Sequence, residues 1–155
     1  MNNNQKGFTL IEMLVVIIII SFLVGIVLTG TLGFQASARD TRRIGDLRNA
    51  QNFLELYFNK CGRYPGDATC GSSSPTSWSE VGGLADIMKN ANITSQFPKG
   101  IAGKKYLYGV AGDGLSYTVG AELERDNSVL KKDAGGTFNG VTCDVSKFIY
   151  CISSF

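Results

Sequence analysis

The sequence predicts an α+β fold, in which a long N-terminal helix packs its outer half on a small antiparallel sheet of three or four strands. An apolar run from Phe8 to Leu32 continues into an amphipathic stretch from Ala38 to Lys60. Two segments that alternate apolar and polar residues follow at 105–111 and 115–123. Helical periodicity and strand periodicity in separate parts of one chain are typical of α+β proteins.

The apolar run is long enough to cross a lipid bilayer. From Phe8 to Leu32 the only charged residue is Glu12. A helix of this length extends about 37 Å, whereas the hydrocarbon core needs about 30 Å. A cleaved secretory signal has a shorter apolar core, followed by a small-residue cleavage site. A plain anchor leaves Glu12 unexplained, because a carboxylate at mid-membrane costs about 2.5–3.5 kcal/mol. Glu12 therefore calls for an explanation: either it has a function, or its side chain simply reaches the membrane interface near the helix start.

The stretch from Ala38 to Lys60 is predicted to extend the helix with one apolar face. Its apolar residues recur at steps of three and four; they are Ile44, Leu47, Ala50, Leu54, Tyr57 and Phe58. The charged residues lie mostly off that face; they are Arg42, Arg43, Asp46, Arg48 and Glu55. Between the two halves, Gly25 and the residues T-G-T-L-G at 29–33 are weak helix formers. They favour either local melting of the helix or close helix packing.

The remaining elements follow a glycine- and proline-rich boundary. Residues 61–66 read C-G-R-Y-P-G and end the helix, and residues 66–80 are predicted to be a loop. A short helix is predicted within 83–92. Gly112-Asp113-Gly114 supplies the turn that joins the two alternating segments into a hairpin. A third strand is predicted around Phe148–Ile152, after the segment 141–145.

The four cysteines form two local pairs in the sequence, Cys61 with Cys70 and Cys143 with Cys151. Four cysteines permit three connectivities, and the sequence favours the local one because it closes short loops. Each bridge is expected to contribute about 2–3 kcal/mol. The spacings lack the close C-x2-C pairs that are typical of zinc sites. Paired cysteines indicate that the C-terminal part lies in an oxidising compartment.

No group of residues predicts catalysis, a cofactor or a metal. The chain has no histidine, which is the commonest general base at neutral pH. Oxygen ligands for calcium cluster after the second predicted strand; they are Glu122, Glu124, Asp126, Asn127 and Asp133. Lys131 and Lys132 stand among them, and a solvated loop of mixed charge is the preferred interpretation. The chain is therefore expected not to be an enzyme.

Nucleic acid is not an expected partner. The basic residues that could contact phosphates are Lys99, Lys104, Lys105, Lys131 and Lys132, with Tyr106 and Tyr108 nearby. Scattered surface lysines are far commoner than phosphate-binding ones and are the preferred interpretation, and the net charge is only +2.

The charges around the apolar run give a conflicting signal about membrane orientation. Only Lys6 precedes the run, whereas Arg39, Arg42 and Arg43 follow it. The positive-inside rule would therefore place the C-terminal part in the cytoplasm. The cysteines indicate the opposite orientation.

The residues Gly7-Phe8-Thr9-Leu10-Ile11-Glu12 resemble the class III signal, G-F-T-L-x-E, of type IV pilins and type II secretion pseudopilins. The resemblance implies that a prepilin peptidase cuts between Gly7 and Phe8 and N-methylates Phe8. It also implies that Glu12 meets the N-terminus of a neighbouring subunit and sets the register of stacked helices. Gly62-Arg63-Tyr64-Pro65 is similar to a motif that follows the long helix in major pseudopilins and many related pilins.

The resemblance implies four segments: a leader at 1–7, a transmembrane and filament-core helix at 8–34, its amphipathic continuation at 35–60, and a disulfide-tied head at 61–155. It further implies a structural subunit of a type IV pilus-like filament, with a type II secretion pseudopilin as the alternative. Expected partners are copies of the chain itself, minor pilins, the prepilin peptidase and an inner-membrane assembly platform. The expected location is the inner membrane, single-pass with the head outside the cytoplasm, and then an extracellular or periplasmic filament.

Overall fold

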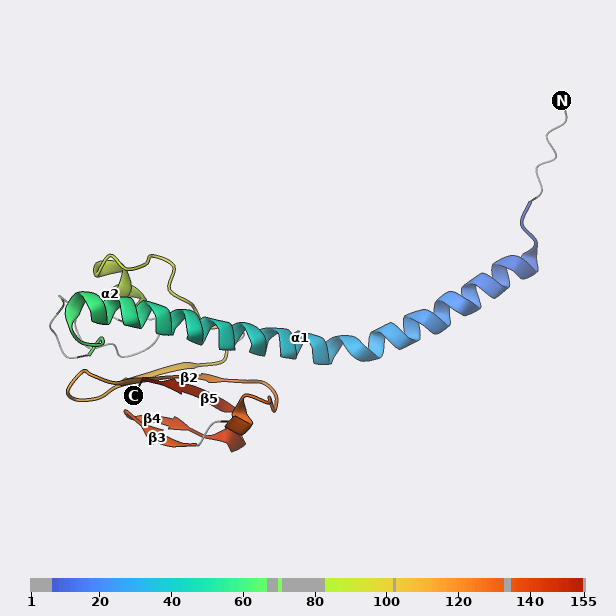
Figure 1. Ribbon diagram of the computed structural model, residues 1–155. Helices are drawn as coiled ribbons and strands as arrows, with labels where there is room; N and C mark the ends of the chain where they lie inside the picture. The colour runs from blue at the N-terminus through green and yellow to red at the C-terminus, as the bar shows by residue number, and fades with distance from the viewer. Residues whose placement is uncertain (1–6, 67–69, 71–82, 102, 133–134, 155) are drawn as a thin grey trace, which may run out of the picture. The chain divides into compact units, whose positions relative to one another are not determined.

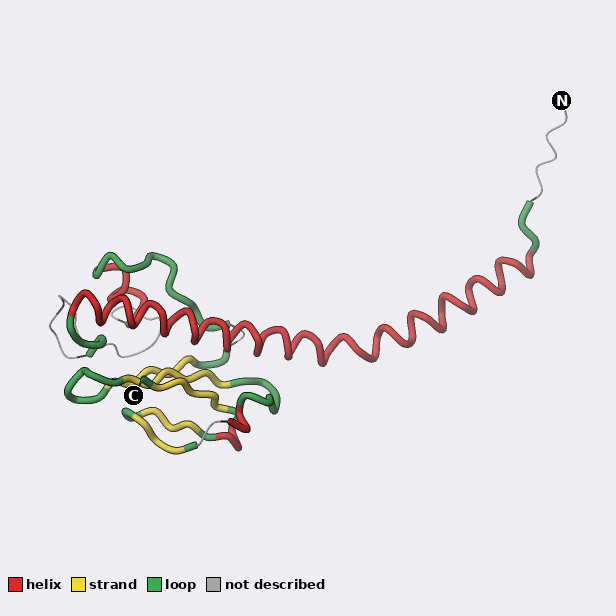
Figure 2. Tube along the Cα trace, in the orientation of Figure 1, coloured by secondary structure: helices red, strands yellow, loops and turns green. Residues whose placement is uncertain are grey.

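The structure, a computed structural model, describes residues 7–66, 70, 83–101, 103–132 and 135–154, with the backbone alone at 28–32 and 132. The predicted leader, apart from Gly7, and most of the predicted loop at 66–80 lie outside these residues. The first helix, α1 (Leu10–Cys61), has 52 residues and belongs to two compact units, Met1–Ala36 and Ser37–Phe155. Figure 1 and Figure 2 show that α1 has no break in its helical backbone. The glycines at 25, 30 and 33 therefore do not end the helix in this structure.

The end of α1 follows the signal at residues 61–66. Gly62 has a φ of +72°, and its N–H donates to the carbonyl of Phe58 at 2.7 Å. A left-handed glycine immediately after the last turn is a common helix stop, because it turns the backbone away without a Cβ clash.

In the second unit, α1 packs on a three-stranded antiparallel sheet, which confirms the α+β prediction. The strands are β1 (Tyr106–Val110), β2 (Tyr117–Glu122) and β5 (Ile149–Ser153), in the order β1-β2-β5. β1 and β2 are the two arms of the predicted hairpin, and β5 is the predicted third strand. Phe148 is in the left-handed conformation and does not belong to the strand.

The other face of the sheet carries a second, two-stranded sheet. It consists of β3 (Gly136–Phe138) and β4 (Val141–Cys143), which pair antiparallel. Figure 1 shows α1 on one side of the three-stranded sheet and the β3–β4 hairpin on the other. Gly109 in β1 allows this layer to approach, because a Cβ there would lie 2.0 Å from the carbonyl oxygen of Asn139. The sequence predicts neither β3 nor the division into two sheets.

The core of this unit forms between α1, the sheet and α2 (Leu84–Asn90), a short helix within the predicted range. Fully buried residues of α1, including Leu47, Ala50 and Leu54, pack with Tyr117 and Val119 of β2. The described residues also include two short 3-10 helices, η1 (Leu130–Lys132) and η2 (Val145–Lys147).

Candidate functional site

The polar residues of the N-terminal motif form a reciprocal helix cap. The Thr9 N–H and hydroxyl both donate to Oε2 of Glu12 at 3.1 Å, and the Glu12 N–H donates to the Thr9 hydroxyl oxygen at 3.3 Å. The Met13 N–H donates to the Thr9 carbonyl at 3.3 Å, so Thr9 is the N-cap and Glu12 the third helical residue. This arrangement is a capping box, which satisfies backbone donors that the first helical turn leaves free.

The capping box explains how the apolar segment accommodates a carboxylate. Glu12 lies in the first turn of α1, where the helix dipole favours negative charge. All atoms of the cap belong to Thr9 or to later residues, so a cut between Gly7 and Phe8 would leave it intact. The new amine of Phe8 would then be covalently adjacent to the capped turn. Gly7 and Phe8 themselves precede the helix and are exposed, with 78% of Phe8 accessible.

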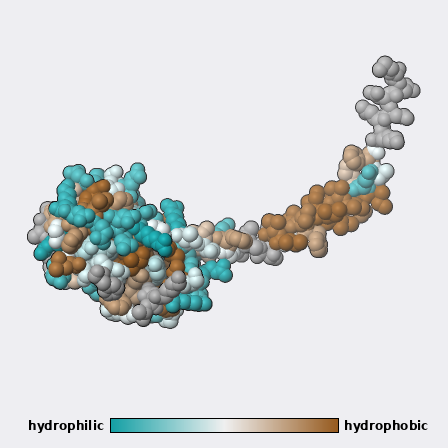
Figure 3. Space-filling view, in the orientation of Figure 1, coloured by the Kyte–Doolittle hydropathy of each residue, from teal (hydrophilic) through white to brown (hydrophobic). Residues whose placement is uncertain are grey.

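After the capped turn, α1 presents a continuous apolar surface that the chain does not cover. Among the described residues, one window, Leu10–Val27, is long and apolar enough to cross a membrane, with a mean hydropathy of 3.1. Its large side chains are roughly half exposed or more; Ile18, for example, is 58% exposed. Figure 3 shows them as a brown surface along the helix. Such a surface requires lipid or other apolar helices around it.

Comparison with known proteins identifies this segment. The family described as the prokaryotic N-terminal methylation motif matches residues 2–28. In this N-terminal motif, the chain resembles the type IV pilin and pseudopilin family.

Individual relatives come from both branches of this family. Type II secretion system core protein G of Aeromonas hydrophila is 34% identical over 39% of this chain and 43% of its own length. The type IV wide pilus major component PilA4 of Thermus thermophilus is 43% identical over 35% of this chain and 41% of its own length. The chain thus spans about two fifths of these two relatives. A fimbrial protein of Neisseria meningitidis serogroup B is 29% identical over 93% of this chain and 91% of its own length. No solved structure matches.

The second unit, which contains the predicted head, has a buried ion-pair cluster that the sequence analysis missed. Arg43 is fully buried, and its guanidinium bonds Asp40 at 2.7 Å, Glu124 at 2.8 Å and the Ile101 carbonyl at 3.1 Å. The Asp40 carboxylate also accepts the backbone N–H groups of Glu124 and Arg125, at 2.9 and 3.2 Å. Asp40 and Arg43 precede Leu47 and Ala50 at the same steps of three and four. The buried face of α1 therefore begins with an ion pair, not with the predicted Ile44, which is only partly buried.

This cluster attaches two distant segments to α1. Arg39 adds a bond from its Nε to Glu124 at 2.8 Å. The hydrogen bonds from Arg39 and Arg43 lower the pKa of the Glu124 carboxyl to about 2. By the positive-inside rule, three arginines that follow the apolar run conflict with the orientation that the cysteines indicate. Two of them, Arg39 and Arg43, pair with carboxylates of the folded head. Arg42 is exposed.

Tyrosine hydroxyls donate hydrogen bonds to the acidic residues of α1 that lie beside its buried face. Tyr106 donates to Asp46 at 2.7 Å, and Tyr64 and Tyr117 donate to Glu55 at 3.0 and 3.3 Å. Burial is the main cause that raises the pKa of Tyr106 and of Tyr117 above the ordinary value. The bonds of Tyr106 and Tyr117 connect the sheet to α1, and the bond of Tyr64 connects the segment after α1 back to this helix.

The two disulfides join Cys61 to Cys70 and Cys143 to Cys151, with Cα–Cα distances of 5.8 and 5.9 Å. This is the local pairing that the sequence favours. The second bridge connects β4 to β5 and so joins the two sheets. The first joins Cys61, the last residue of α1, to Cys70.

Five of the residues considered for calcium or nucleic acid have other partners in the head. Glu122 pairs with Lys104, and Glu124 pairs with Arg39 and Arg43. The hydroxyl of Tyr106 donates to Asp46, and that of Tyr108 donates to the Pro65 carbonyl at 2.6 Å. Among the described residues, no group of three or more His, Cys, Asp or Glu could hold a metal ion. Asp133 lies outside them.

Proposed function

We propose that this chain is a structural subunit of a type IV pilus-like filament and polymerises through its apolar helix. The observation that carries the proposal is the N-terminal methylation motif at the start of an uncovered apolar helix. In the membrane, lipid surrounds that helix; in a filament, the helices of other subunits replace the lipid. Burial of the apolar surface stabilises either environment.

The motif gives the proposed order of events. A prepilin peptidase cuts between Gly7 and Phe8 and methylates the Phe8 amine. The subunit stays in the inner membrane with its head outside the cytoplasm, until an assembly platform adds it to copies of itself and to minor pilins. Glu12 then pairs with the N-terminus of a neighbouring subunit. The two disulfides support the orientation, since such bonds persist in oxidising compartments.

A type II secretion pseudopilus is the second candidate. The similarity to core protein G of the Aeromonas system and the residues Gly62-Arg63-Tyr64-Pro65 favour it. The similarity to the Neisseria fimbrial protein, which covers 93% of the chain, favours the pilus. Deleting the gene discriminates between them: a pilus subunit is expected to cause loss of surface filaments, and a pseudopilin to cause loss of protein export.

The first prediction tests processing. Filaments sheared from cells should yield a chain that begins with N-methylated Phe8, as measured by mass spectrometry of the N-terminal peptide. Gly7→Val should block the cut because its side chain is bulky, whereas Gly7→Ala, which stays small, should be processed. Filament protein that still begins at Met1 would refute the proposal.

A further inference from the structure

At the outer edge of β1, the backbone groups of Tyr108 and Val110 have no hydrogen-bond partner among the described residues. β1 is an edge strand of the three-stranded sheet. The Ala111 N–H donates to the Ser116 carbonyl, and the Glu122 N–H donates to the Lys105 carbonyl. Because ladder bonds alternate along an antiparallel pair, the N–H and C=O groups of Tyr108 and Val110 point away from β2. Within the described part of the chain, these four groups make no hydrogen bond.

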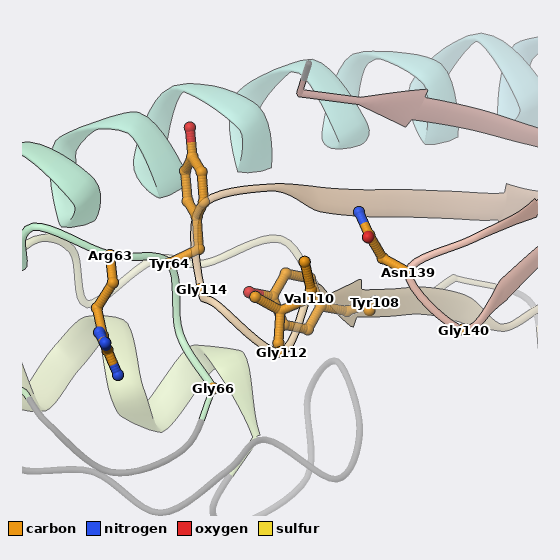
Figure 4. Close-up of a pocket in the computed structure, with 11 residues that line it drawn as sticks. Arg63, Tyr64, Gly66, Tyr108, Val110, Gly112, Gly114, Asn139 and Gly140 are labelled. Carbon is orange, nitrogen blue, oxygen red and sulfur yellow. The ribbon is translucent and has the colours of Figure 1, made fainter.

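A pocket opens along this edge. It has a volume of about 420 Å³ and is lined by Tyr108, Val110, Arg63, Gly66 and Asn139, among others. This volume falls within the range of roughly 300–1,000 Å³ that is usual for ligand pockets. Figure 4 shows Tyr108 and Val110 between Arg63 at one end and Asn139 at the other. Gly66 packs closely against Val110 in this wall, because a Cβ there would lie 3.0 Å from Cγ1 of Val110.

Arg63 places a positive charge at one end of the pocket. The Tyr64 N–H donates to the Gly114 carbonyl at 2.8 Å and holds this segment against the hairpin turn. A Cβ on Gly114 would lie 3.2 Å from Cβ of Arg63, so the base of the side chain is closely packed. In the described residues the guanidinium has no salt bridge, in contrast to Arg39 and Arg43.

We propose that the edge of β1 binds an extended peptide that carries a carboxylate. The peptide would pair its backbone with Tyr108 and Val110 as an added strand and place its carboxylate on Arg63. A small anion would use Arg63 alone, whereas an extended peptide complements both the charge and the row of free N–H and C=O groups. The site is separate from the N-terminal motif, and the proposal does not rest on the filament function.

The test uses the full chain in detergent and dye-labelled synthetic peptides. Acetyl-Thr-Val-Glu-Val-Thr-amide is the probe, and the same peptide with Gln in place of Glu is its uncharged match. A third peptide, with Pro in place of both Val residues, lacks two backbone donors. Fluorescence anisotropy should show binding of the Glu peptide, about tenfold weaker binding of the Gln peptide, and no binding of the Pro peptide.

Variants locate the binding. Arg63→Gln should reduce affinity for the Glu peptide to that for the Gln peptide. Arg48→Gln is the matched control, because it removes an exposed arginine of α1 outside the pocket, and it should bind as the parent does. Hydrogen exchange measured by mass spectrometry should show slower exchange of the segment 106–111 when the Glu peptide is bound.

Several results would overturn the proposal. These are equal binding of the Glu and Gln peptides, an unchanged affinity in Arg63→Gln, or no slowing of exchange at 106–111. Protection of that segment by self-association, without peptide, would assign the edge to a second copy instead. Filament yield from the parent chain is measured in parallel. A parent chain that forms filaments but binds no Glu peptide would overturn this proposal alone, whereas a parent chain that binds the peptide but forms no filaments would refute only the filament function.

Discussion

The two halves of α1 form one continuous helix but satisfy their side chains in opposite ways. Between Leu10 and Val27 the large apolar side chains remain uncovered, and Ile18 is 58% exposed. In the second unit, Leu47, Ala50 and Leu54 are fully buried against the sheet and α2. The second unit supplies its own core, whereas the apolar half depends on lipid or on other subunits. One helix thus places its first half in an apolar environment outside the chain and its second half against the chain's own core.

Charged residues show the same contrast. Glu12 is satisfied within one helical turn by Thr9, and therefore needs no tertiary structure. Asp40 and Arg43 bond to segments 58 to 85 residues away. Substitutions in the apolar half should consequently affect assembly, and substitutions in the head should affect folding.

The largest expected effect is on assembly, from Glu12→Leu. Insertion into the membrane should be normal or easier because the charge penalty disappears, whereas filament yield should fall sharply. The amount of membrane-bound subunit measures insertion, and the yield of sheared filaments relative to that amount measures assembly.

Glu12→Gln separates the charge of Glu12 from its capping role. Glutamine can also complete a capping box, so this variant keeps the cap and removes the charge. If both variants give few filaments, assembly requires the charge of Glu12. If Glu12→Gln gives a normal filament yield and Glu12→Leu does not, assembly requires the cap. Normal yield from Glu12→Leu would show that Glu12 has no role in register.

Arg43 and Arg42 provide a matched pair within the head. Arg43→Met should destabilise the head by about 3–5 kcal/mol, because it leaves the buried Asp40 carboxylate without its cation. Arg42→Met, at the exposed neighbouring position, should change stability by less than about 0.5 kcal/mol. Urea unfolding of the full chain in detergent, followed by near-ultraviolet circular dichroism, measures the difference. Equal effects would mean that the cluster does not stabilise the head.

The disulfide between Cys143 and Cys151 should contribute less. Cys143→Ser should destabilise the C-terminal strands by about 2–3 kcal/mol, while the apolar helix still inserts. The variant should reach the membrane and be processed, yet be degraded or absent from the surface. Immunoblots of the membrane fraction and of the sheared surface fraction would show this. Non-reducing digestion of the parent should return peptides that join each local pair. Free thiols at all four positions would contradict this and would reopen the question of orientation.

The smallest effect is the acid sensitivity that Glu124 adds. Its folded pKa, about 2, lies below its ordinary value of 4.5. The stabilisation is therefore complete above about pH 4.5 and is lost as the pH falls toward 2. Urea midpoints of the parent and Glu124→Gln should differ at pH 6 and converge on acidification. A difference that does not depend on pH would show that the carboxylate's ionisation is not what stabilises the cluster.

The sequence by itself determined the features that depend on neighbouring residues. The apolar segment, its N-terminal motif and the helix stop at Gly62 each depend on short-range chemistry. The β1–β2 hairpin follows from strand periodicity around a glycine-rich turn, and the spacing of the cysteines indicated the local disulfide pairing. In all of these, the partners are near one another in the chain, with sequence separations of 9 and 8 for the two disulfides.

The tertiary structure alone decided the features whose partners are distant in the chain. Arg42 and Arg43 are chemically identical neighbours, yet only Arg43 lies in line with Leu47 and faces Glu124 and the Ile101 carbonyl. In the same way, Gly109 looks like an ordinary strand residue until the turn at Asn139 packs against it. The open edge of β1 also depends on which strands pair. Burial and pairing are set by segments that the fold brings together, and local periodicity carries no information about them.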